Sequence, residues 1–379
     1  MMILENLVLR TPMNAGAVRI VIKGDRIQDI QPIEQDYTEE NKDRIQFSNA
    51  VALPGFINSH DHLDFNLFPL LANRVYNNYA EWARDIQVTG KKEIDAVLRI
   101  PEEIRVQWGC YKNLLNGFTT VVNHGKNLEI GNSPVYVHQC CTSLHSTAFE
   151  KSWKLKLNNP LNRNRVVAMH IGEGQDEMAA KEIELVKRWN LLHKKIIAVH
   201  GIAMNKKQAK QFEGLVWCPA SNQKLIGETA EIEELENVIP IVFGTDSTLS
   251  AGWNAWMHFR LGLGEPGMNE SGLLEMLTAT PAELWNLQGK GILKENAIAD
   301  IVITEQKADL FQNNPEDMLM VVQNGRVRLF DESLASQIQL PDFSRVSINN
   351  RIKFVEGDLP GLINSIRSYY PSIVLPVTI

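Results

Sequence analysis

The sequence predicts an α/β protein in which parallel strands alternate with helices. Short apolar runs rich in β-branched residues recur from residue 56 onward, and amphipathic stretches such as DEMAAKEIELVKRWNLL lie between them. Polar residues follow several of these runs directly, as His170 follows VVAM and His200 follows IIAV. A parallel barrel carries its active site at the carboxyl ends of its strands, so we expect a (β/α)8 TIM-like barrel.

The expected strands of the barrel are seven apolar runs. They lie at residues 56–60, 118–125, 135–144, 166–170, 196–200, 215–218 and 240–245. Residues 72–88 and 100–116 are predicted helices, and Gly117 is suited to end the second. Seven runs instead of eight indicate that one βα unit is reduced or missing.

Both ends of the chain carry a different pattern, with short strands and tight turns. Lys23-Gly24-Asp25 and Asn324-Gly325 are hairpin-turn sequences between apolar runs. We therefore expect a small β-sandwich domain built from residues 1–52 with 291–335. The barrel would occupy residues 53–290, and residues 336–379 would form a C-terminal extension with a short helix.

Composition narrows the class of partner. The 379 residues carry a net charge of -7, which disfavours binding to nucleic acid or to an anionic membrane surface. We recognise no signal peptide and no apolar run of membrane-spanning length. Four cysteines without metal-ligand spacing read as reduced thiols, so we expect a cytoplasmic protein that acts on a small molecule.

Six polar residues at the predicted strand ends indicate a metal centre. His60 and His62 form an H-x-H pair whose side chains share one face of a strand. Each residue also has a plain structural alternative, such as a core histidine bonded to a backbone carbonyl or an aspartate that shapes a turn. Their joint occurrence favours the metal site, for which the candidates are His60, His62, His170, Glu173, His200 and Asp246.

At this point the chain resembles the amidohydrolase superfamily, in particular the mononuclear cytosine deaminase and chlorohydrolase branch. The matching motifs are PGFINSHDHL (54–63), FTTVVNHG (118–125), HIGE (170–173), VHG (199–201), WCPASN (217–222) and FGTDS (243–247). The resemblance implies that His60, His62, His170 and Asp246 bind one divalent metal ion. It makes Glu173 the catalytic acid and base, and His200 a group that hydrogen-bonds the metal-bound water.

The metal is expected to be Zn²⁺, with Fe²⁺ or Mn²⁺ as alternatives, because imidazole and carboxylate ligands suit all three. The stretch VYVHQCCT has no lysine of the kind that binuclear members carboxylate, which favours a single ion. Related proteins are commonly dimers, so a homo-oligomer is expected.

The chain departs from this branch in the length of one segment. The 42 residues from His124 to Arg165 are fewer than this branch usually has between the second strand and the HxxE strand. Substrate contacts usually drawn from that region are therefore hard to place. His124, Trp217, Asn222 and Ser247 are candidates because they lie in or beside the motifs, whereas His145, His193 and His258 are expected to be surface residues.

Three functions are compatible with these residues. The first is hydrolytic deamination of an amino-substituted N-heterocycle by a metal-activated water, which makes the protein a hydrolase acting on C–N bonds. The second is opening of a cyclic amide, as in the similar imidazolonepropionase. The third is a degenerate barrel that binds a small molecule without catalysis.

Overall fold

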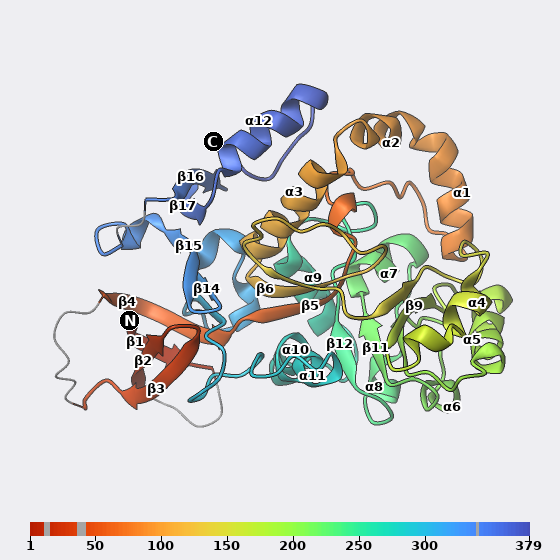
Figure 1. Cartoon of the computed structure of the whole chain (residues 1–379), viewed down its shortest axis with the longest axis horizontal. Helices are drawn as coiled ribbons and strands as arrows, with labels where there is room; N and C mark the ends of the chain where they lie inside the picture. The colour runs from red at the N-terminus through yellow and green to blue at the C-terminus, as the bar shows by residue number, and fades with distance from the viewer. Residues whose placement is uncertain (11–15, 36–42, 339–340) are drawn as a thin grey trace.

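The computed structural model describes residues 1–10, 16–35, 43–338 and 341–379, and its strands fall into three hydrogen-bonded sheets (Figure 1). The strands are β1 Met2–Leu9, β2 Ala17–Lys23, β3 Arg26–Pro32, β4 Asp43–Pro54, β5 Phe56–Asp61, β6 Phe118–Asn123, β7 Tyr136–His138, β8 Thr142–Leu144, β9 Val167–Ile171, β10 Ile196–His200, β11 Gly214–Trp217, β12 Ile241–Phe243, β13 Ile301–Glu305, β14 Met318–Gln323, β15 Arg326–Asp331, β16 Phe343–Ile348 and β17 Arg351–Glu356. The α-helices are α1 Tyr79–Thr89, α2 Lys91–Leu98, α3 Glu102–Leu115, α4 Trp153–Leu157, α5 Glu177–Trp189, α6 Lys206–Ala209, α7 Pro219–Ile226, α8 Ile232–Leu235, α9 Ala255–Leu263, α10 Glu270–Leu277, α11 Ala279–Leu284 and α12 Leu359–Tyr369.

Two sheets of parallel strands form the centre of the molecule, which makes the fold α/β as predicted. One has the order β5-β6-β7 and the other the order β12-β11-β10-β9-β8. Every residue of β5, β6, β9 and β10 is buried, as expected for parallel strands that are covered on both faces. Their carboxyl ends point to one side of the molecule, where the polar residues of the motifs lie.

The chain passes from one parallel sheet to the other within residues 135–144, which the sequence predicts as one strand. The first part, β7, pairs with β6, and the second part, β8, pairs with β9. Only residues 139–141 separate the two, so no helix fits between them. At the opposite edge the backbone N–H groups of Thr245 and Asp246, just beyond β12, donate to His60 O at 3.2 and 3.1 Å, which ties β12 to β5.

Helix ends follow local capping chemistry. The helix expected over 72–88 begins only at Tyr79, because Asn78 Oδ1 accepts the backbone N–H of Glu81 at 2.9 Å and fixes the start there. Helix α5 begins in the same way after Asp176, and its apolar face is buried, as its helical spacing predicts. The helix expected over 100–116 is α3.

The strands from both ends of the chain share a nine-stranded sheet of order β16-β17-β15-β14-β13-β4-β1-β2-β3 (Figure 1). Strand β4 lies inside it, parallel to β1 and antiparallel to β13, and runs on almost directly into β5. Strands β16 and β17 of the C-terminal extension also belong to this sheet. Hydrogen bonds join all nine described strands in one sheet, and side chains of β1, β4, β13, β14 and β15 share one hydrophobic core.

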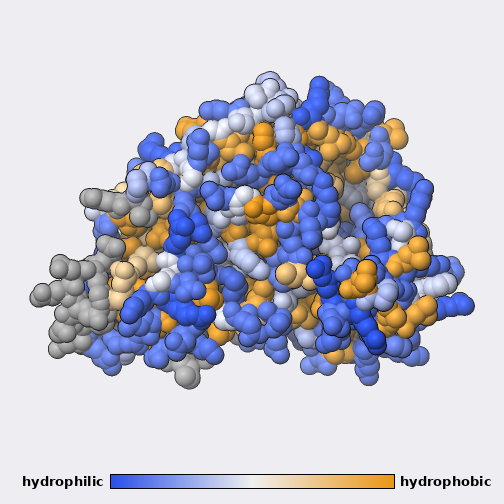
Figure 2. Space-filling view, viewed as in Figure 1, coloured by the Kyte–Doolittle hydropathy of each residue, from blue (hydrophilic) through white to orange (hydrophobic). Residues whose placement is uncertain are grey.

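The surface is mainly polar. On the face drawn in Figure 2, hydrophilic residues predominate and hydrophobic ones form scattered patches. Within the described part of the chain, no helix combines the length and the apolar character that a membrane crossing requires.

Candidate metal centre and active site

The carboxyl ends of the parallel strands bring six polar side chains to one place. His60 lies near the end of β5 and His62 follows it, His170 lies in β9, and His200 is the last residue of β10. Glu173 and Asp246 lie on the loops after β9 and β12. Segments far apart in the sequence therefore meet because parallel strands end at the same edge.

Four of these side chains have separations that suit a metal ion. Ligand atoms of His60, His62 and His170 all lie within 4.8 Å of one another, and the Nε2 atoms of His60 and His170 are 3.1 Å apart. Asp246 Oδ1 lies 3.6 Å from Nε2 of both His60 and His62. Two ligands bound tetrahedrally at about 2.05 Å would lie about 3.3 Å apart, so this donor set fits a divalent ion.

The buried imidazoles are in the form that binds metal. Burial lowers the pKa of His62 to about 3, and nearby imidazoles reinforce the effect. Burial and the neighbouring histidines also hold the pKa of His170 well below its usual value. Neutral imidazoles offer a lone pair at neutral pH, as metal ligation requires.

Asp246 is held as a carboxylate by its surroundings. Burial alone would raise its pKa, but the hydrogen bond with His60 and the neighbouring imidazoles keep that pKa well below the usual range. Ser221 Oγ and Ser250 Oγ donate to Asp246 Oδ2 at 2.8 and 2.6 Å. The other oxygen, Oδ1, faces the histidines.

The backbone at Asp246 and His200 has an uncommon conformation. Their φ angles are 54° and 72°, in the left-handed region that residues with a Cβ atom rarely adopt. Such conformations persist where surrounding contacts impose them, and they are concentrated at functional sites. Here they turn the two side chains at their strand ends toward the common centre.

Glu173 and His200 form a second pair beside the four candidate ligands. His200 Nε2 lies 3.6 Å from Glu173 Oε2, and its Nδ1 is 2.8 Å from Asn222 Oδ1. An amide oxygen only accepts hydrogen bonds, so Nδ1 carries the proton and Nε2 presents a lone pair. Burial lowers the pKa of His200 to about 4.

The environment of Glu173 favours its protonated form. Burial raises its pKa well above the usual value, and the carboxylates of Asp246 and Glu182 add to the effect. Two carboxyl groups near one centre thus differ in protonation, because several histidines surround Asp246 whereas Glu173 is buried near the carboxylates of Asp246 and Glu182. Such a division is typical of a site that needs both a proton acceptor and a proton donor.

Glu182 of α5 holds the loop that carries Glu173. Its carboxylate accepts the backbone N–H of Gly172 at 3.0 Å, the Thr147 hydroxyl at 2.7 Å and the Tyr79 hydroxyl at 3.0 Å. The backbone N–H of Tyr79 in turn donates to Glu173 O at 3.1 Å. One buried side chain therefore fixes three segments of the wall around Glu173.

A buried ionic network lies behind the candidate ligands. Asp61 lies between His60 and His62, and its carboxylate accepts Lys112 Nζ at 3.0 Å and Asn113 Nδ2 at 2.7 Å. Lys112 Nζ also donates to Thr245 Oγ1 at 3.0 Å, next to Asp246. This network joins β5, α3 and the loop after β12, and so constrains both parts of the ligand set.

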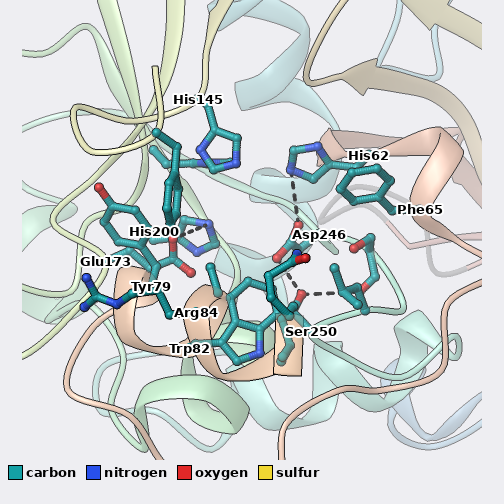
Figure 3. A pocket seen from close by; sticks show the side chains of 17 residues that line it. His62, Phe65, Tyr79, Trp82, Arg84, His145, Glu173, His200, Asp246 and Ser250 are labelled. Carbon is teal, nitrogen blue, oxygen red and sulfur yellow. Dashed lines mark hydrogen bonds and ion pairs between the residues drawn. The ribbon is translucent and has the colours of Figure 1, made fainter. Parts of the chain in front are cut away.

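The candidate ligands open into a cavity of about 350 Å³. Figure 3 shows His62 on one side and Glu173, Tyr79 and Arg84 on the other, with Asp246 between them. Besides the site residues, the lining includes Phe65, Tyr79, Trp82, Arg84, Gln87, His145, Phe149, Leu249 and Ser250. An apolar wall with a few polar groups is the usual form of a small-molecule site.

The four predicted substrate residues have different positions. Ser247 lines the cavity, whereas Asn222 is buried behind His200. His124 stacks on His170 with ring centroids 4.4 Å apart, and its Nε2 lies 3.2 Å from Leu144 O. Trp217 is in the core against Phe243 and is not part of the cavity lining, because its strand turns this side chain away from the cavity.

Of the histidines expected at the surface, His145 is exposed as predicted, but it also lines the cavity, with its ring centroid 5.0 Å from that of His170. His258 is buried, with Nε2 2.8 Å from Gly252 O. The cavity residues on α1, among them Tyr79, Trp82 and Arg84, were also missed. They belong to no motif, so no local signal in the sequence marked them.

Sequence comparisons agree with the motifs. A sequence model described as the amidohydrolase family matches residues 161–328. A 5-methylthioadenosine/S-adenosylhomocysteine deaminase of Pyrococcus horikoshii is 23% identical, over 82% of this chain and 90% of that protein. The protein of the same name from Pyrococcus abyssi is 27% identical over 40% of each chain.

Solved structures share the fold at low sequence identity. An atrazine chlorohydrolase from Arthrobacter aurescens TC1 complexed with zinc has a TM-score of 0.71 at 15% identity and covers 97% of this chain and 100% of its own. An adenosine deaminase from Xanthomonas campestris with bound zinc has a TM-score of 0.69 at 13% identity, covering 98% of both chains. The resemblance to the amidohydrolase family is thereby confirmed: residues 161–328 match its sequence model, and nearly the whole chain has the α/β fold with an added domain of these solved hydrolases.

Proposed function

We propose that this protein is a metal-dependent hydrolase that removes an amino group from an N-heterocycle and releases ammonia. The observation that carries the proposal is the placement of Glu173 and His200, in a cavity, beside three histidines and Asp246 with the spacing of a metal site. The names of the curated relatives support a deaminase and favour adenine nucleosides as the first compounds to test.

One divalent ion would be held by His60, His62, His170 and Asp246. Zinc is the first choice, because two solved neighbours contain it and because imidazole and carboxylate are among its usual ligands. When bound, such an ion supplies a water whose pKa falls toward ~7, so that hydroxide is available at neutral pH.

The protein groups would then divide the proton transfers. Asp246, held as a carboxylate, accepts the proton that the attacking water loses. Glu173, held protonated, gives its proton to a ring nitrogen as the new C–O bond forms at the amino-bearing carbon. The same carboxyl groups then transfer a second proton to the amino nitrogen. The C–N bond breaks and ammonia leaves.

His200 would orient the attacking group. Its Nδ1–H is engaged by Asn222, so Nε2 can only accept a hydrogen bond at neutral pH. Accepting from water fixes the direction of the oxygen lone pair toward the substrate carbon.

We also propose that the two parallel sheets make up one barrel. Two observations support this. The chain runs from β7, which pairs with β6, directly into β8, which pairs with β9, and the loop after β12 donates hydrogen bonds to His60 O of β5. The three residues between β7 and β8 contain no helix, which corresponds to the reduced βα unit expected from the sequence.

The test combines metal analysis with an ammonia assay. Protein loaded with Zn²⁺, Fe²⁺ or Mn²⁺ is incubated with adenine nucleosides, guanine, aminopyrimidines and aminotriazines, and a panel of lactams is run in parallel. About one metal per chain with ammonia from at least one amine would support the proposal. Metal without ammonia but with lactam opening would replace it by cyclic-amide hydrolysis, and failure to bind any metal would favour a non-catalytic binding protein.

A further inference from the structure

The cavity contains a cation that the proposed chemistry does not use. Arg84 of α1 is the one lysine or arginine among the described residues that line the cavity. It lies on the side of Glu173, across from His62 (Figure 3). Metal binding and proton transfer involve neither its charge nor its donors.

Arg84 forms no ion pair with any residue that the structure describes, although acidic residues are close in sequence on the same helix. Glu81 pairs with Arg74 at 2.9 Å, and Asp85 accepts the Tyr76 hydroxyl at 2.8 Å. Both acidic side chains of α1 thus have partners other than Arg84.

The cavity carboxyl groups do not pair with Arg84 either. Asp246 contacts the imidazoles of His60 and His62 and two serine hydroxyls, and Glu173 faces His200. Arg84 is exposed where it lines the cavity, and its five N–H donors are available to water or to a ligand. Its guanidinium can therefore donate hydrogen bonds to a ligand group instead of to water.

The neighbours of Arg84 define what that ligand would look like. Gln87 lies one helical turn further on and also lines the cavity, so its amide adds a donor on the same face. Phe149, which is 43% exposed, and Trp82 provide apolar surface nearby. This combination suits a flat heterocycle whose far end carries a negative charge.

We propose that Arg84, assisted by Gln87, binds an anionic substituent of the substrate, a carboxylate or a phosphate, while the heterocycle lies against the metal centre. The inference rests on the proposed deaminase function and specifies its substrate class. A planar guanidinium matches both anions through two parallel hydrogen bonds, and charge-assisted bonds of this kind are about twice as strong as neutral ones.

The test measures binding with matched ligand pairs. Adenosine 5′-carboxylate is compared with adenosine 5′-carboxamide, and adenosine 5′-monophosphate with adenosine, by calorimetry on zinc-loaded protein. The measurements use the Glu173→Gln background to keep the ligands intact. We expect at least one anion to bind about 10-fold or more tighter than its neutral partner, in line with hydrogen bonds to charged groups. The pair with the larger preference identifies the anion.

Variants of Arg84 isolate its contribution. Arg84→Met should reduce the anion preference to about one, and Arg84→Lys should retain part of it, because the charge remains but the paired geometry is lost. Arg188→Met is the matched control: Arg188 of α5 is exposed, forms no ion pair within the described chain and lies outside the cavity. It should retain the full preference.

Equal binding of charged and neutral partners by the parent protein would overturn the inference, and so would an unchanged preference in Arg84→Met. Failure of the proposed function is a different result, namely the absence of ammonia from every amine tested. Ammonia from neutral nucleosides without anion preference would support the deaminase function and refute the anion site. Anion preference without any ammonia would support the anion site and refute the deaminase function.

Discussion

Replacement of Lys112 by methionine tests whether the buried network behind the site holds the ligand set in place. Lys112 is 1% exposed and Asp61 is fully buried. Without the ammonium, the Asp61 carboxylate keeps only amide donors, from Asn66 and Asn113 at 2.7 Å each and from Asn58 at 3.3 Å. Breaking a buried ion pair on one side typically costs about 3–5 kcal/mol, and we expect a loss in that range.

The same change should weaken metal binding. His60 and His62 flank Asp61, and Thr245, which loses the Lys112 hydrogen bond, precedes Asp246. Loss of groups that orient metal ligands typically reduces affinity by about 10–100-fold. The assays are urea unfolding of the metal-free protein and competition with a chelator of known zinc affinity at a temperature where the variant is folded.

Lys353→Met is the matched control. Lys353 is also fully buried and donates to Asp331 Oδ2 at 2.6 Å, but it belongs to β17 of the nine-stranded sheet. It should lose a comparable free energy of unfolding and keep its zinc affinity. If zinc affinity falls equally in the two variants, or if Lys112→Met loses less than about 1 kcal/mol, the reasoning about this network is wrong.

Three other predictions concern proton transfer, metal binding and pH. Glu173→Gln should keep the metal and lose turnover by ~10²-fold or more, because the amide cannot transfer the proton; full activity with a normal metal content would contradict its role. Asp246→Ala should lose both metal and activity, as elemental analysis would reveal, and a fully loaded variant would show that Asp246 is no ligand. Burial lowers the pKa of His258 to about 4. Below pH 6.5 the unfolded chain therefore binds a proton that the folded protein does not, and the free energy of unfolding decreases as the pH is lowered. At pH 5 this amounts to about 2 kcal/mol, so urea unfolding of His258→Gln should show a drop between pH 7.5 and 5 that is smaller by that amount; an equal drop would contradict it.

Much of the fold could be predicted because several strands of the two parallel sheets contain short apolar or β-branched runs. Strands buried on both faces are rich in such residues, so IIAV of β10, VAM of β9 and the start of β5 and β6 were recognisable without knowledge of their neighbours. The stretch 135–144 was recognised as a strand, but its division into β7 and β8 was not. That division depends on which neighbours each half pairs with.

The site residues also divide into those that the sequence predicted and those that it did not. His60, His62, His170 and Asp246 stand at strand ends, so membership of one cluster followed from the parallel arrangement. Arg84 and His145 had no such position in the sequence. Helix α1 and the loop after β8 reach the cavity through the way they pack, and no local pattern encodes that packing.

Residue types and strand periodicity, which can be read without the fold, were enough to predict the α/β class, the candidate ligands and the chemistry that such residues can perform. The tertiary structure sets the protonation pattern, in which histidines surround Asp246 while Glu173 is buried near the carboxylates of Asp246 and Glu182. It also places Lys112 behind the ligands and Arg84 in the lining of the cavity. Burial and charge separation depend on distances between segments far apart in the chain, and those distances exist only once the chain has folded.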